Sequence, residues 1–285
     1  MNRQHDGHHQ ASKEETMQSN NPVFRNSEEF NRVGGGQMSD PSTWGTGLPG
    51  TPTQTSSAPM TIDSVVQKTG ISLAVVIVTA LATWVLTPEI TTTSGNVSSI
   101  FAALTVGMLG AFALSMVNSF KKVISPALVL LFCAFEGVAM GALSKLFNSM
   151  FEGNIVMSAV IGTFAAFGGT LAVYKFFNIQ VGTKFRTFVI AAMFGMVALS
   201  LMELVLGAFG SGTGLFGFGG LGTLTAIAGL VLGVFMLILD FDYVEKGVAA
   251  GIPERESWRA AFAMTVSLVW IYTNLLRLLA IFSQD

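Results

Sequence analysis

Residues 221–240 read LGTLTAIAGLVLGVFMLILD and contain no charged side chain before the final aspartate. A helix rises about 1.5 Å per residue, so about 20 apolar residues cross the hydrocarbon core of a bilayer, which is about 30 Å thick. A stretch of this length and composition therefore predicts a transmembrane helix. Backbone groups in lipid need hydrogen-bond partners within the protein, which excludes an open strand here.

Six further stretches have the same character. The whole chain is 51% hydrophobic and only 11% charged, against roughly a quarter charged in ordinary globular domains. The seven expected spans cover approximately 70–88, 97–118, 125–147, 154–175, 186–208, 221–241 and 259–282. The sequence thus predicts an all-α integral membrane protein whose residues 66–285 form a bundle of seven transmembrane helices.

Lysine and arginine are distributed unevenly among the connecting segments, and this predicts the orientation of the bundle. Short segments rich in these residues stay in the cytoplasm. The basic residues before the first span and in every second connection are Lys68, Lys121, Lys122, Lys175, Lys184, Arg186, Lys246, Arg255 and Arg259. The alternate connections hold only Lys145, at a helix end. We therefore expect the N-terminus inside the cell and the C-terminus outside.

Residues 1–65 precede the spans and are rich in Asn, Gln, Ser, Thr, Gly and Pro. This composition buries too little apolar surface to offset chain entropy, so we expect a disordered cytoplasmic tail, with residues 1–60 dispensable for folding. The tail holds all the histidines (His5, His8 and His9) and a candidate docking motif, SNNPVFRN at 19–26. No signal peptide is recognisable, and the sequence leaves open whether Met1 or Met17 is the start.

Several enzyme classes lack the residues that they require. With no histidine after residue 9, the spans cannot supply the Ser–His pair of a rhomboid-like protease or an HExxH zinc site. The single cysteine, Cys133, provides no disulfide or multi-cysteine metal site. A GxGxxG pattern at Gly217, Gly219 and Gly222 joins two spans and has no βαβ unit around it. We expect no enzymatic activity, no resident cofactor and no nucleic-acid partner.

Ionisable residues inside the spans are candidates for function. Each costs at least a few kcal/mol at the bilayer centre and tends to face a partner or a water-filled cavity. Glu136 lies near the middle of the third span, and its position favours a functional role. Glu203 and Arg277 lie toward the outer ends of the fifth and seventh spans, where snorkelling to the interface explains them.

Asp240 is the strongest candidate because apolar residues surround it. VFMLIL precedes it and Phe241 follows, so a low dielectric favours its neutral form and allows its charge to change near physiological pH. Asp242 and Glu245 follow at the membrane edge. A paired-aspartate protease built from Asp240 and Asp242 is disfavoured, since both lie on one segment. These features predict a proton-sensitive gate for ions.

Several strings together resemble the Bax inhibitor-1 (transmembrane Bax inhibitor motif) family, in its bacterial branch. They are AFEGVAMGAL in the third span, LILDFDYV at the end of the sixth and NLLRLLAIF at the end of the last. The resemblance covers about residues 68–282, and the phrase NPVFRN is similar to actinobacterial members. It implies a seven-helix bundle with a central last helix, in the bacterial plasma (inner) membrane.

The resemblance also implies a pH-sensitive calcium leak governed by two hydrogen-bonded aspartates, one in each of the last two spans. Asp240 matches the first aspartate, but residues 259–282 contain no carboxylate. Alignment of NLLR puts Ser267 at the partner position, whereas alignment of the aromatic residues puts Asn274 there. Depth in the membrane favours Ser267. Glu136 is the remaining candidate for a second acid.

Two classes of function stay open at this stage. The first is a calcium or cation leak with the lipid bilayer and transient calcium ions as its partners. The second is a regulatory membrane protein that binds other membrane proteins, such as proteases or stress factors, and transports nothing. The family resemblance supports both, and flux measurements in liposomes distinguish them.

Overall fold

The computed structural model describes residues 58–89, 97–151, 153–177 and 179–284. The predictions for the three histidines and for the motif at 19–26 lie outside the described residues, as does most of the segment 1–65. Within the described ranges the regular structure is entirely helical. The helices are α3 (Ile62–Leu86), α4 (Val97–Phe120), α5 (Pro126–Met150), α6 (Ile155–Phe176), α7 (Thr183–Ala208), α8 (Gly220–Ala249) and α9 (Ser257–Phe282), with a short 3-10 turn, η2 (Glu254–Glu256), before the last.

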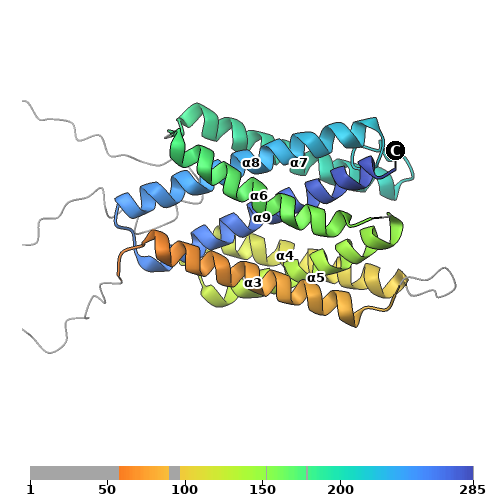
Figure 1. Ribbon diagram of the computed structural model, residues 1–285, viewed down its shortest axis with the longest axis horizontal. Coiled ribbons are helices and arrows are strands. Elements are labelled where there is room, and N and C mark those ends of the chain that lie inside the picture. The colour runs from red at the N-terminus through yellow and green to blue at the C-terminus, as the bar shows by residue number, and fades with distance from the viewer. Residues whose placement is uncertain (1–57, 90–96, 152, 178, 285) are drawn as a thin grey trace, which may run out of the picture. The chain divides into compact units, whose positions relative to one another are not determined.

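All seven α-helices are long and apolar enough to cross a membrane. The predicted all-α membrane fold with seven spans is therefore confirmed. The orientation of the bundle relative to the cytoplasm stays a prediction. In Figure 1 the helices alternate in direction, so the start of α3 and the α8–α9 connection lie at the same end of the bundle.

Two helices, α3 and α8, extend about two turns beyond the expected spans, and the other helices differ from them by less than one turn. α3 begins at Ile62 rather than near 70 because Thr61 and Ser64 form a capping box, in which each side chain bonds the other residue's backbone N–H, at 3.1 and 3.2 Å. Lys68 is therefore part of α3. α8 continues to Ala249 and ends where Gly251 adopts the left-handed conformation, with φ of 63°. Asp242 and Glu245 consequently lie on a helix.

α9 is the central helix of the bundle. It packs against α3, α5, α6 and α8, and most of its length is surrounded by them (Figure 1). The central last helix implied by the family resemblance is present. α4 packs mainly against α5, and α7 mainly against α8. Val189 is the one residue of α7 that is buried among the described residues, so this helix is peripheral.

Small residues let α3 and α5 approach closely. A Cβ added at Gly137 would overlap Thr79 and the carbonyl of Val76, and one at Gly141 would overlap the backbone of Ala80. Close backbone approach of this kind replaces the hydrophobic drive that lipid does not provide. Gly137 and Gly141, which are four residues apart on α5, therefore form the α5 side of the α3–α5 contact.

Residues Ala58–Met60, here called the N-terminal clasp, pair with the α8–α9 connection. The Met60 N–H donates to the carbonyl of Ile252 at 2.7 Å, and the Glu254 N–H donates to the carbonyl of Ala58 at 2.8 Å. The Met60 side chain is only 1% exposed. The clasp is therefore part of the packed bundle, and the expectation that residues 1–60 are dispensable for folding stays a prediction.

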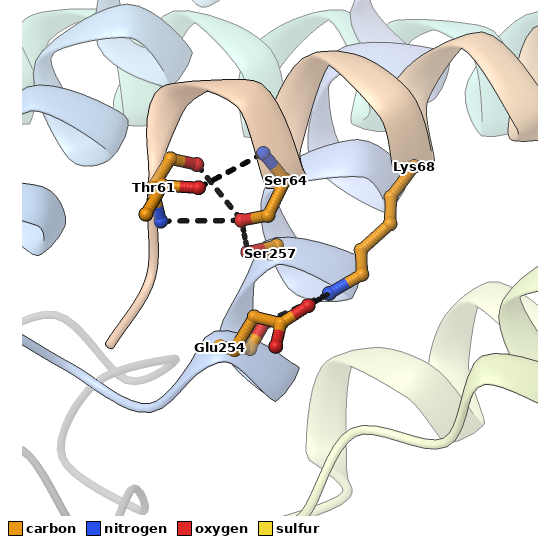
Figure 2. Close-up of polar contacts among 5 residues, drawn as sticks. All are labelled: Thr61, Ser64, Lys68, Glu254 and Ser257. Carbon is orange, nitrogen blue, oxygen red and sulfur yellow. Dashed lines mark hydrogen bonds and ion pairs between the residues drawn. The ribbon is translucent and has the colours of Figure 1, made fainter. Parts of the chain in front are cut away.

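Side chains of α3 continue the contact that the clasp begins (Figure 2). The hydroxyls of Ser64 and Ser257 are 2.7 Å apart. Lys68 pairs with the Glu254 carboxylate at 2.8 Å and donates to the Glu254 carbonyl at 3.1 Å. The start of the first span is thus bound to the start of the last.

Candidate functional site

Asp240 and Ser267 meet where α8 crosses α9. The Ser267 hydroxyl donates a hydrogen bond to Oδ2 of Asp240 at 2.6 Å. Ser267 is 1% exposed, and Asp240 is partly buried among the apolar residues that precede it on α8. The last two spans are therefore joined through a carboxyl group inside the membrane region.

Asn274, the alternative partner, lies elsewhere along the same interface. It packs against Gly229, about three helical turns from Asp240 along α8, and its amide donates to the Trp270 carbonyl at 2.8 Å. The Trp270 indole in turn donates to the Gly229 carbonyl at 2.8 Å. Asn274 thus helps to hold α8 against α9, and the structure brings Ser267 to Asp240.

Glu136 is partly buried in α5 and does not join this pair. Among the described residues it forms neither a hydrogen bond nor an ion pair. One turn earlier on α5, Cys133 is fully buried, and Ser72 of α3 and Thr265 of α9 are fully buried as well. Glu136 therefore lies one turn of α5 from the fully buried Cys133, and its carboxylate is not bound to Asp240 or Ser267.

Asp242 belongs to an ion-pair cluster at the end of the bundle that holds the α8–α9 connection. It is 3% exposed and pairs with Arg186 of α7 at 2.9 Å and with Lys246 at 2.7 Å. One turn along α8, Glu245 accepts a hydrogen bond from Tyr174 of α6 at 2.5 Å. The cluster joins α6, α7 and α8. Within it, the cationic side chains of Arg186 and Lys246 balance the negative charge of the Asp242 carboxylate.

Few of these partners could be predicted from the sequence. Arg186 was predicted only as a basic residue of a connecting segment, and no pattern in the sequence pointed to Tyr174. The available signal was the spacing of Asp242 and Lys246, which places them one turn apart on a helix. The pairing with α6 and α7 depends on how distant segments pack, which no local pattern encodes.

Glu203 binds the α7–α8 connection, and Arg277 binds the start of α8. The Glu203 carboxylate accepts hydrogen bonds from the backbone N–H groups of Thr213 and Gly214, at 3.1 and 2.8 Å. Arg277 donates to the Gly222 carbonyl at 2.7 Å and to the Thr225 hydroxyl at 2.5 Å. Both residues therefore organise the end of the bundle opposite the clasp.

Several acidic residues near the ends of the helices have basic partners, whereas the two deeper in the membrane region have none among the described residues. Near the ends of the helices Asp242, Glu254 and Glu256 each pair with a lysine or arginine. Within the described part of the chain, neither Asp240 nor Glu136 has a basic partner. An unpaired carboxyl group inside a span can bind a proton when neutral and attract a cation when ionised.

The described residues show no group of three or more His, Cys, Asp or Glu side chains placed to hold a metal ion. A family model described as Bax inhibitor 1 like matches residues 21–284. A search of curated proteins gave no match.

Proposed function

The chain belongs to the Bax inhibitor 1 like family and is a multi-pass membrane protein, and from this premise we propose that it is a pH-sensitive leak for calcium or other cations. The proposed location is the plasma membrane of a bacterium. The hydrogen bond between Asp240 and Ser267 is the observation that carries the proposal, since it joins the last two spans through a group that can change its charge.

The state of the Asp240 carboxyl group controls passage in this proposal. When neutral, the group accepts the hydrogen bond from Ser267 and carries no charge that would draw in water, so α8 stays packed against α9. When ionised, it has no donor and has no basic partner among the described residues, so it attracts water and cations. Flux should therefore be low at acidic pH and rise as the carboxyl group ionises.

Calcium flux into proteoliposomes, followed across a pH series, tests the proposal. Asp240→Asn keeps a donor and removes the charge, so it should give low flux that does not depend on pH. Asp240→Ala removes both and should leak at every pH. Asp63→Asn is the matched control because Asp63 is exposed at the start of α3, and it should behave like the wild type.

Wild-type flux and an unchanged pH response in both Asp240 variants would exclude this residue as the gate. The same measurement on Glu136→Gln then tests the other acid inside the spans. Absence of flux through the wild-type protein at any pH would exclude the leak itself.

A regulatory role without transport is the second candidate, and the position of α7 favours it. This helix packs mainly against α8 and exposes large side chains such as Phe188, Phe194 and Leu204, at 58%, 70% and 70%. In a membrane such a face contacts lipid or another membrane protein. Recovery of a specific partner by cross-linking from α7, together with no flux in liposomes, would support this role over the leak.

A further inference from the structure

A cleft lies between α3 and α6, with α5 and α9 forming its floor. Its volume is about 350 Å³. All four helices are membrane spans, so the cleft lies at the depth of the hydrocarbon chains. Apolar cavities of about 150 Å³ already hold a molecule such as benzene, so this volume accommodates a larger apolar group.

The rim and the floor of the cleft differ in exposure. Rim residues Leu81 of α3 and Met157 of α6 are both 60% exposed. Floor residues Met140 of α5 and Leu268 of α9 are 8% and 3% exposed. The cleft therefore opens sideways, toward the surface that faces lipid.

The hydroxyl groups of the lining are already occupied. Ser144 bonds the Met140 carbonyl and the Tyr272 hydroxyl, each at 2.5 Å. Thr163 donates to the Ala159 carbonyl at 2.7 Å. The rest of the lining is almost entirely apolar. A water molecule needs two to four polar partners, so neither water nor a polar ligand suits this site.

We propose that the cleft binds one acyl chain of a membrane phospholipid. Along α3 the lining runs from Leu73 to Trp84, a distance of about 17 Å at about 1.5 Å per residue, or roughly half of a hydrocarbon core of about 30 Å. That is the depth of a single leaflet. With the predicted orientation of the bundle, the chain belongs to the outer leaflet.

Recognition rests on the acyl chain and not on the headgroup. The nearby cation is Lys145, which follows the lining residue Ser144 and is only 4% exposed. Its ammonium group donates to the carbonyls of Trp84 and Thr87, at 2.9 and 2.5 Å, and lies 3.3 Å from the Glu89 carboxylate. Its hydrogen bonds are thus directed to the end of α3, which leaves it unsuited to a lipid phosphate.

Native mass spectrometry of the protein released from mixed-lipid nanodiscs tests the site. The wild type should retain one phospholipid, with phosphatidylglycerol and phosphatidylethanolamine of equal chain length retained equally. Val160 lines the cleft, so Val160→Trp should lower the retained fraction roughly tenfold. Val173→Trp is the matched control on the same helix, at a 47% exposed position outside the cleft, and should retain the lipid.

A phospholipid with a diazirine in its acyl chain gives a second readout that needs no variant. Cross-links in the wild type should concentrate on 73–84 and 156–164, with far fewer on α7, although α7 is more exposed. An even distribution over all exposed helices would overturn the proposal. Retention of the anionic lipid alone, or equal loss of lipid from both tryptophan variants, would overturn it as well.

Discussion

Asp240 and Asp242 are two residues apart, yet their environments differ completely. Successive residues of an α-helix are about 100° apart around its axis, so these two side chains leave α8 about 200° apart. Asp240 faces Ser267 of α9, whereas Asp242 faces Arg186 of α7. One carboxylate is therefore paired with cations and the other is bound only by a hydroxyl, which makes Asp240 the titrating candidate.

Ser267→Ala should raise calcium flux at acidic pH. The variant removes the hydroxyl that binds Asp240 across the interface but leaves the carboxyl group able to ionise. Flux should still increase with pH, from a higher starting level. Proteoliposome flux at acidic and at neutral pH measures both features.

Thr273→Val is the control for Ser267→Ala. Its hydroxyl bonds only the carbonyls of Val269 and Trp270 within α9. This variant should keep the wild-type flux at each pH. A Ser267→Ala profile that coincides with the control would show that the interhelical hydrogen bond does not restrain passage.

At the scale of the helices, the α3–α5 contact depends on two glycines of α5, Gly137 and Gly141, which have no side chain to separate the backbones. Gly141→Ala should lower the melting temperature in detergent, since the added methyl group would overlap the backbone of Ala80 and push α3 away. Overpacking of this kind costs about 1–3 kcal/mol. Gly168→Ala on α6 is the control, because its Cβ would meet no atom within 4 Å. Equal melting temperatures for both variants would contradict the close approach.

The N-terminal clasp should also contribute to stability. Met60→Ala removes a side chain that is 1% exposed, and such a truncation costs about 2–5 kcal/mol in a well-packed core. We expect a melting temperature several degrees below that of the wild type. Ile62→Ala, at a 60% exposed position two residues later, should change it little. If Met60→Ala also melts like the wild type, the clasp does not stabilise the bundle.

For the molecule as a whole, cysteine labelling tests the predicted orientation. Gly212 lies in the α7–α8 connection and Gly251 in the α8–α9 connection. Cysteines introduced there should react with a membrane-impermeant reagent from outside at 212 and only after permeabilisation at 251. The native Cys133 is fully buried and should give no background. The reverse labelling pattern would show that the bundle has the opposite orientation. Equal access at both positions would contradict a membrane crossing by α8, which lies between them.

The number and approximate positions of the spans follow from local composition, which is why they could be predicted. The early start of α3 could have been read from Thr61 and Ser64, which are suitable capping residues. The bond between Ser64 and Ser257 could not, because it joins residues 193 positions apart. Ser267 was favoured over Asn274 by its depth, an argument that worked because both helices cross the same membrane.

The central place of α9 also affects biosynthesis. Ser257, which binds Ser64, is 193 residues further along the chain. At a translation rate of about 5–20 residues per second, it is synthesised roughly 10–40 seconds after Ser64. Until then α3, α5, α6 and α8 lack the helix that they surround, and Asp240 lacks Ser267. A ribosome that stalls before α9 leaves an intermediate with an unmatched acid in lipid. Arrival of the last span therefore supplies both the helix that the others surround and the partner of Asp240.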